Sequence, residues 1–374
     1  MSYERYSCPN ENCKMHGQVG AGNIGHRCWY GKNKERELLR CKICKKTFSA
    51  ERDTAFNHSK LSKEKFCQIL ECLCQKAGVR GTARIVGVGT NTVLRVIRIA
   101  AAHFEAVSRI MIRDINVTEV PMDEFWSFIK KKEKNASEAE IEQGEAGDRY
   151  TYVSMDAASR LIISIATGRR IQETADTMLQ ALKVCLSCAY VTCLTLILFT
   201  SDAWDQYYVG LKKIFGFWHR PRRRRQTGRR RNFRQYLPWN LLYATVEKIK
   251  DGAGKVTRVI RTVVHGSSDL VEQVIQDSSV SSTINTAFVE RINATFRAFC
   301  SRLVRKSCSF SKKSSYHDAH IKIVTAFYNF VHPHRTLTES NGQNTSPAME
   351  AGLTNHCWSL MELCSFPVSR ASCQ

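Results

Sequence analysis

The sequence is poor in acidic residues and has no long hydrophobic run. Asp and Glu total 34 against 56 Lys and Arg, which gives a formal net charge of +22 at pH 7. The longest apolar run, AYVTCLTLILF at 189–199, is too short to span a bilayer, and its β-branched residues favour a buried strand. The stretch MSYERYSCPN has no apolar core, so we expect no signal peptide and no membrane segment.

The excess of positive charge predicts a polyanionic partner. Nucleic acid is the first candidate and an anionic membrane surface the second, while a basic surface that is merely solvated is the alternative. The chain has 374 residues, 43% of them hydrophobic, which suffices for two or three modules and a sizeable core. In a chain of this size, the 16 cysteines indicate reduced thiols and a metal site rather than a disulfide framework.

Four of the cysteines form two short pairs near the N-terminus. Cys8 and Cys13 lie in CPNENC, and Cys41 and Cys44 lie in CKICKKTF. Thiolate pairs on two turns can close a tetrahedral shell around Zn²⁺, and a segment this small could hardly bury a core without the metal. We expect a zinc-ribbon-like domain at 1–58 with a structural Zn²⁺; four unliganded cysteines are the alternative. Three further candidate ligands lie between the pairs: Cys28, His16 and His26.

The next segment, 59–112, has the helical spacing of a DNA-binding domain. GVRGTARIVGV predicts a short helix, and GTNTVLRVIRIAAAHF predicts a longer one after a glycine turn. A short helix, a glycine-containing turn and a basic helix are typical of a helix-turn-helix, although an ordinary helical core is the alternative. The residues expected to meet DNA in the major groove are Asn91, Thr92, Arg95 and Arg98.

Three carboxylates lie on predicted elements of an α/β domain at 113–350. VTEVPMDEFWSFI predicts a strand that carries Asp123, and YTYVSMDAASRLIISIATG predicts a hairpin followed by a helix. LTLILFTSDAW then predicts a buried strand that ends in Asp202. This order is that of a ribonuclease-H-like fold, whose first strand is central and lies beside the later parallel strand. Asp123 and Asp202 would therefore meet near one edge of the sheet.

Glu290 could reach the same point from a later helix, TINTAFVERINATFRAF. Clustered acids suit phosphoryl transfer, because Mg²⁺ prefers oxygen ligands and two such ions can activate a nucleophile and stabilise a leaving oxygen. The alternative is a surface glutamate paired with Arg291 or Arg297. Glu124 follows Asp123 directly, so we expect it to point to the opposite face of the strand.

Several of these motifs resemble one known family. MDEFW, TSDAW, INTAFVERINATFRAFCSRLVRKSCSFSKK and PAMEAGLTNHCWSL are similar to the transposases of the bacterial insertion-sequence IS1 family, over essentially the whole chain. The resemblance implies a DDE transposase whose catalytic acids, Asp123, Asp202 and Glu290, bind two Mg²⁺ (or Mn²⁺) ions. The family's helix after the glutamate carries polar and basic residues, which correspond here to Asn293, Arg297 and Arg302.

An arginine-rich segment, HRPRRRRQTGRRRNFRQ, lies between the second and third acids. With Trp218 and Phe233 at its edges, it could grip a phosphate backbone and stack on bases, or it could be a basic segment that repels itself. Together with a predicted β-hairpin at 240–266, it would form a basic insertion at about 216–280. The arginines expected to bind DNA are Arg222, Arg223, Arg224, Arg225, Arg229, Arg230 and Arg231.

We therefore expect an α/β chain whose catalytic domain has a mixed five-stranded sheet and flanking helices, with a tail at 351–374. The expected transposase would bind the terminal inverted repeats of its element, cut a strand with water, and join the freed 3′-hydroxyl to target DNA. Its partners would be double-stranded DNA and at least one further copy of itself, with no membrane, in a prokaryotic cytoplasm near the nucleoid. A metal-dependent nuclease of the same fold and a catalytically inactive DNA-binding regulator are the alternatives.

Overall fold

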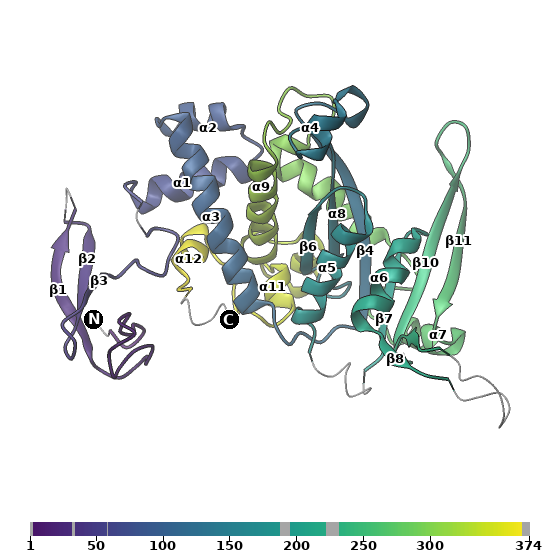
Figure 1. Cartoon of the computed structure of the whole chain (residues 1–374), viewed down its shortest axis with the longest axis horizontal. Coiled ribbons are helices and arrows are strands. Elements are labelled where there is room, and N and C mark those ends of the chain that lie inside the picture. The colour runs from purple at the N-terminus through teal and green to yellow at the C-terminus, as the bar shows by residue number, and fades with distance from the viewer. Residues whose placement is uncertain (1–2, 32–33, 58, 188–194, 222–231, 369–374) are drawn as a thin grey trace. The chain divides into compact units, whose positions relative to one another are not determined.

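In the computed structural model, the chain forms two compact units (Figure 1). The first comprises Met1–Cys72, Val79–Ile110 and Trp358–Gln374, and the second comprises Leu73–Gly78 and Met111–Cys357. The residues that the structure describes are 3–31, 34–57, 59–187, 195–221 and 232–368. Seven residues expected to bind DNA lie outside these ranges: Arg222, Arg223, Arg224, Arg225, Arg229, Arg230 and Arg231.

The first unit contains a small antiparallel sheet with a cysteine-rich core. Its strands, in the order β1-β2-β3, are β1 (Ile24–Tyr30), β2 (Arg36–Cys41) and β3 (Thr47–Ser49). The buried cluster beneath them consists of Cys8, Cys13, Ile24, Leu39 and Cys41. Because so little aliphatic surface is buried here, the thiols make up much of this core.

Three helices of the first unit follow the predicted pattern. They are α1 (Lys63–Cys74), α2 (Val79–Val86) and α3 (Thr90–Met111). The chain turns between α2 and α3 at Gly87, whose φ of +68° is a left-handed conformation that glycine adopts without strain. The axes of α2 and α3 are bent by 108° at this break, which lies in the range of a helix-turn-helix.

The C-terminal segment belongs in part to the first unit. Helix α12 (Leu360–Ser365) begins at Ser359, whose side chain forms a capping box with Glu362. The backbone N–H of Ala55 donates to the carbonyl of Cys364 at 2.9 Å, and Leu363 is completely buried. Of the predicted tail at 351–374, the described residues from Trp358 to Val368 therefore belong to the first unit.

The second unit is built on a mixed six-stranded sheet of order β11-β10-β7-β4-β5-β6. Strand β4 is antiparallel to β5 and parallel to β7, and β7 is parallel to β10. The sheet has one strand more than the five predicted, because the hairpin expected in an insertion joins it through β10. The six strands are β4 (Glu119–Ile129), β5 (Gly147–Met155), β6 (Ile162–Gly168), β7 (Ile197–Ser201), β10 (Leu241–Lys250) and β11 (Val256–His265).

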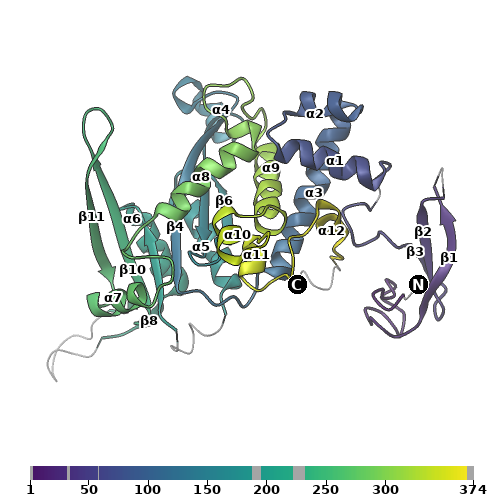
Figure 2. The same cartoon turned by 180° about the vertical axis from the view of Figure 1, so that it is seen from behind.

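Helices cover both faces of this sheet. Figures 1 and 2 show α5 (Gln172–Cys185) and α6 (Asp205–Phe215) on one face, and α8 (Ala287–Phe299) and α9 (Ser314–Ala326) on the other. The α/β class predicted from the sequence is thus confirmed. The remaining elements of this unit are β8 (Phe217–His219), β9 (Arg234–Tyr236), α4 (Glu138–Glu142), α7 (Ser268–Gln276), α10 (Arg335–Asn341) and α11 (Pro347–Glu350), with short 3-10 turns at Glu133–Asn135 and Ser301–Leu303 and a π turn at Phe327–Val331.

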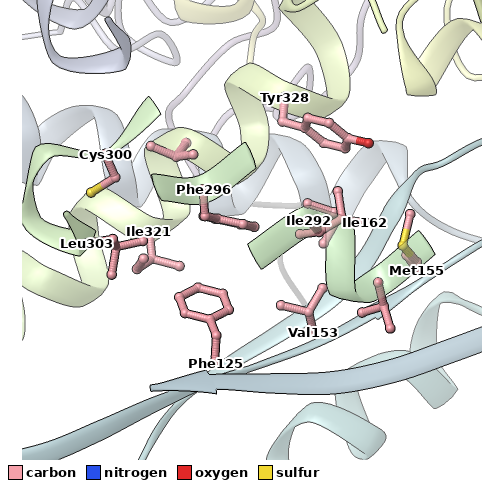
Figure 3. Packing of buried hydrophobic residues seen from close by; sticks show 12 residues of the cluster. Phe125, Val153, Met155, Ile162, Ile292, Phe296, Cys300, Leu303, Ile321 and Tyr328 are labelled. Atoms are coloured by element: carbon pink, nitrogen blue, oxygen red, sulfur yellow. The ribbon is translucent and has the colours of Figure 1, made fainter. Parts of the chain in front are cut away.

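Helix α8 is fixed to the sheet by one apolar stripe. Val289, Ile292 and Phe296 recur at helical spacing and are buried in a cluster with Phe125 and Val153 of the sheet (Figure 3). The rings of Phe125 and Phe296 are 5.3 Å apart. This packing fixes the rotation of α8 about its axis, and therefore also fixes where its polar stripe lies.

No single helix of the described ranges is both long and apolar enough to cross a membrane. The bent pair α2 and α3 meets the length and composition requirement when the two are taken together.

Candidate active site

Asp123 and Asp202 lie at the same level of two neighbouring parallel strands. The last residues in register between β4 and β7 are Pro121 and Thr200, and each aspartate follows two positions later. Strand β7 ends at Ser201, whereas β4 continues to Ile129, so the sheet opens here. Ligands of open α/β sheets bind in such a crevice, at the carboxyl ends of parallel strands.

An open pocket of about 740 Å³ lies at this end of the sheet. Asp123, Asp202 and Glu290 all line it, so the structure brings the three predicted acids to one place. The other charged or amide residues of the lining are Glu124, Arg170, Glu247, Lys248, Lys250, Asn293, Arg297 and Arg305. The pocket thus combines carboxylates with a rim of cations, which suits an anionic substrate and a metal ion together.

The polar stripe of α8 faces this pocket. Glu290, Asn293 and Arg297 are three and four residues apart, so they lie on one side of the helix. The Nδ2 atom of Asn293 donates to Oδ2 of Asp123 at 2.9 Å. Its Oδ1 atom is buried and has no hydrogen-bond partner among the described residues. One amide oxygen beside the carboxylates is therefore an uncommitted acceptor.

The carboxylates of the pocket are poorly solvated. Burial raises the pKa of Asp123 to about 7, and the charge of Glu124 adds to that effect. Burial also raises the pKa of Asp202 and of Glu124. Acids that repel one another in a partly dry site are stabilised by a cation, and carboxylate and amide oxygens are the donors that hard divalent cations prefer. Asp123, Asp202 and Glu290 could hold such an ion.

Side-chain cations pair with three of these acids, Glu290, Glu124 and Asp202. The Nζ atom of Lys248 lies 2.5 Å from both carboxylate oxygens of Glu290. An amino group of Arg170 lies 2.7 Å from Oε1 of Glu124 and 3.7 Å from Oδ2 of Asp202. Within the described ranges, the only group of three or more His, Cys, Asp or Glu side chains already gathered as for a metal ion is a thiol cluster of the first unit. A divalent ion at Glu290 or Asp202 would compete with these cations for the carboxylate oxygens.

Glu124 and Asp123 point to opposite faces of β4, as alternation along a strand requires. Glu124 accepts a hydrogen bond of 2.7 Å from the hydroxyl of Tyr207 on α6, whereas Asp123 contacts Asn293 on α8. Both residues nevertheless line the pocket, because it extends around the open end of the sheet. The sequence analysis missed Glu124 as a pocket residue for this reason.

Arg170 was also missed, since it carries no local motif. Besides its ion pair with Glu124, its guanidinium stacks over the ring of Trp204, 4.8 Å from the ring centre. Its side chain remains 41% exposed beside Asp202. The buried acid and the indole therefore hold a cation in a defined place next to the predicted catalytic acid.

Arg302 is not brought to the pocket. Its Nε atom donates to Nδ1 of the buried His320 at 3.2 Å, and burial lowers the pKa of the guanidinium. Helix α8 ends at Phe299, and a 3-10 turn at Ser301–Leu303 redirects the chain. Arg305, three residues further on, lines the pocket instead. The expectation for Arg302 assumed continued helical spacing, which this turn interrupts.

The four predicted thiols of the first unit form one cluster. The sulfur atoms of Cys8, Cys13, Cys41 and Cys44 lie within 4.8 Å of one another. The alternative ligands are not part of this cluster: His16 and Cys28 are exposed, and Nδ1 of His26 is 2.9 Å from Glu37.

The CKICKK turn favours the thiolate form that metals bind. The backbone N–H of Lys46 lowers the pKa of Cys44 to about 6. Burial is the largest effect and raises the pKa of Cys41, but hydrogen bonds from the backbone N–H groups of Cys44 and Ile43 and from the side chains of Asn23 and Cys8 together lower it below its ordinary value. Lys45, between Cys44 and Lys46, has a φ of +62°, a left-handed backbone conformation. The cluster could hold a metal ion such as zinc.

The residues expected to meet DNA lie at the start of α3. Asn91, Arg95 and Arg98 are exposed, at spacings of four and three residues along one side of the helix, and Thr92 is half-buried. Arg84 of α2 lines a shallow hollow at the turn between the two helices, together with Thr90. The geometry therefore presents a polar and basic surface on the first turns of α3.

Comparison with known proteins does not identify a family for this chain. No protein-family model matches the chain, and no curated protein matches it significantly.

Proposed function

We propose that the protein is a DDE-type DNA transposase, similar to those of the insertion-sequence IS1 family. The observation that carries this proposal is the convergence of Asp123, Asp202 and Glu290 on one pocket, two of them at the same level of parallel strands. A ribonuclease-H-like assignment is supported by the order β6-β5-β4-β7-β10, in which the first strand is central and the hairpin lies on its antiparallel side.

The three acids would hold Mg²⁺ or Mn²⁺, as two ions. The donor set fits such ions, because the carboxylates are crowded and partly dry and the Oδ1 atom of Asn293 has no partner among the described residues. When bound, the ions supply activation of water or of a 3′-hydroxyl and stabilise the leaving oxygen. The chain's own part is to hold the DNA strand against the acids.

The cationic rim would bind the DNA backbone. Lys250, Arg297 and Arg305 line the pocket beside the acids, and phosphate contacts of this kind position a strand without reading its sequence. The surface of α3 would read the terminal inverted repeats, and the thiol cluster would hold a structural Zn²⁺. Bringing two element ends together requires at least a dimer on double-stranded DNA, in a prokaryotic cytoplasm near the nucleoid.

The test uses labelled, pre-cut ends of the element with Mg²⁺ and purified full-length protein. The wild-type protein should join the ends to a target duplex. Asp202→Asn should abolish joining while terminal-repeat binding is retained. Asp205→Asn is the matched control, because Asp205 is an exposed acid one helical turn away that does not line the pocket, and it should keep joining activity.

Two results would point to the alternative functions. Metal-dependent cleavage without joined products would favour a nuclease of the same fold. Terminal-repeat binding with neither reaction would favour a DNA-binding regulator. Full joining activity of Asp202→Asn would reject the assignment of this pocket as the catalytic site.

A further inference from the structure

Glu290 has a resident counter-ion that comes from the hairpin. Lys248 lies on β10, and its Nζ atom is 2.5 Å from both oxygens of the Glu290 carboxylate. The hydroxyl of Thr286 donates to Oε1 of the same group at 2.5 Å. Lys248 thus contacts both oxygens, and because an ammonium group and a divalent ion repel each other, an ion that coordinates this carboxylate would compete with Lys248 for it.

The ion pair is accessible and exchangeable. The side chain of Lys248 is 32% exposed and that of Glu290 is 40% exposed, so water can screen the pair. Lysine carries its charge on a flexible four-carbon stem, which can move to another anion at little cost. A divalent cation brings twice the charge of an ammonium group, and carboxylate oxygens are ligands that hard divalent cations prefer.

Arg170, the other cation beside the acids, is held differently. It is bound to the buried Glu124 and stacked on Trp204, so loss of its longer contact to Asp202 would leave it in place. Lys248, in contrast, is held in the pocket by its ion pair with the proposed metal ligand Glu290.

We propose that Lys248 is an exchangeable counter-ion that couples metal binding to DNA binding. In the metal-free protein it neutralises Glu290; when a divalent ion takes Glu290, the freed ammonium group contacts a backbone phosphate in the pocket. This inference rests on the proposed function, because it takes Glu290 as a metal ligand and DNA as the substrate. It assigns Lys248 as a positioning residue rather than a metal ligand.

The first test measures Mn²⁺ binding to the zinc-loaded full-length protein without DNA, by electron paramagnetic resonance of free Mn²⁺. Lys248→Met should bind Mn²⁺ more tightly than the wild type, roughly three- to tenfold, because a competing cation has been removed. Lys250→Met is the matched control: Lys250 lies on the same strand and lines the same pocket but is exposed. Its Mn²⁺ affinity should stay close to that of the wild type.

The second test measures DNA affinity against salt concentration, with Ca²⁺ as a divalent ion that need not support turnover. Loss of one phosphate contact lowers the slope of log K against log salt by about 0.9. Lys248→Met should show this loss with Ca²⁺ and no loss without a divalent ion, since Lys248 is then paired with Glu290. Lys250→Met should show the same loss under both conditions.

A third variant imitates metal binding. Glu290→Gln frees Lys248 without any ion, so metal-free Glu290→Gln should bind DNA with a slope steeper than wild type by about 0.9. This gain should disappear in the double variant Lys248→Met/Glu290→Gln and persist in Lys250→Met/Glu290→Gln. A gain that persists in both double variants would reflect loss of negative charge alone and would overturn the inference.

The outcomes separate this inference from the proposed function. If Glu290→Gln weakens Mn²⁺ binding but Lys248→Met does not strengthen it, the counter-ion role is rejected and the metal site stands. If Glu290→Gln and Asp123→Asn both leave Mn²⁺ binding unchanged, the metal site itself is rejected. Two results together would support the proposed exchange of Lys248 between Glu290 and a phosphate: Lys248→Met binds Mn²⁺ more tightly, and it lowers the slope of log K against log salt for DNA binding only when Ca²⁺ is present.

Discussion

The Nδ2 atom of Asn293 lies 2.9 Å from Oδ2 of Asp123, so helix α8 and strand β4 are joined directly at the pocket. This hydrogen bond favours the charged form of Asp123, yet burial and the neighbouring Glu124 raise its pKa to about 7. The charged form of Asp123 is therefore electrostatically unfavourable in the folded protein, at the position where a divalent cation is proposed to bind.

That cost predicts a pH-dependent stability. The pKa of Asp123 rises from an ordinary 3.8 to about 7 on folding, so between these values the folded state binds more protons than the unfolded state. The free energy of unfolding should then fall as pH rises from about 4 to about 7. Without added divalent ion, Asp123→Asn should be more stable than wild type at pH 8 by about 1–3 kcal/mol, and this difference should vanish below pH 4.

Urea unfolding across this pH range measures the effect, with the bound zinc retained. Asp205→Asn removes an acid from an exposed position outside the pocket and should not show the pH-dependent gain. If Asp123→Asn raised the free energy of unfolding equally at pH 4 and pH 8, the stabilisation would not come from removal of the Asp123 charge. Added Mn²⁺ should stabilise the wild type more than Asp123→Asn, because the ion binds the folded state only.

The thiol cluster predicts about one tightly bound zinc per chain. Cys41→Ser should lose it, since Cys41 is completely buried within the cluster. Cys28→Ser is the control in the same small sheet, because Cys28 is exposed and outside the cluster. Elemental analysis of the purified proteins measures the metal. Retention of zinc by Cys41→Ser would show that the metal is bound by other residues.

The surface of α3 predicts sequence-dependent binding. Asn91→Ala should weaken binding to the terminal repeat by about 1–3 kcal/mol and reduce discrimination against an unrelated duplex. Arg109→Ala is the control on the same helix, because Arg109 lies near its far end and pairs with Glu105 at 2.8 Å. Fluorescence anisotropy on both duplexes measures the two constants. A similar loss of terminal-repeat affinity in both variants would argue against the proposal that the first turns of α3 read the major groove.

The core beneath α8 predicts a large stability effect away from the acids. Phe296→Ala should destabilise the second unit by about 3–5 kcal/mol, because it removes a fully buried ring that packs on Phe125. Thr295→Ala, its half-buried neighbour on the same helix, should change stability by no more than about 0.5 kcal/mol. Denaturant unfolding measures both; a small effect of Phe296→Ala would mean that other contacts hold α8 on the sheet.

Local sequence patterns predicted the elements and the residues on them. Alternation and a β-branched run placed Asp123 on one strand and Asp202 at the end of another. Asp123 lies on β4, and Asp202 directly follows β7, which ends at Ser201. The two short cysteine spacings predicted a cluster that the structure contains. These features depend on neighbouring residues and on the period of each element, so they can be recognised without the rest of the fold.

The ion pairs and the strand order depend on residues far apart in the chain. Lys248 meets Glu290 only because β10 pairs with β7, and no local pattern specifies that register. Arg302 faces His320 and Arg305 lines the pocket because a 3-10 turn ends the helical spacing after α8. The spacing of residues along the chain thus determined which carboxylates and thiols could serve as site residues. Long-range strand pairing and the rotation of α8 decided which cations stand beside them, because a side chain's partner is set by the packing of whole elements.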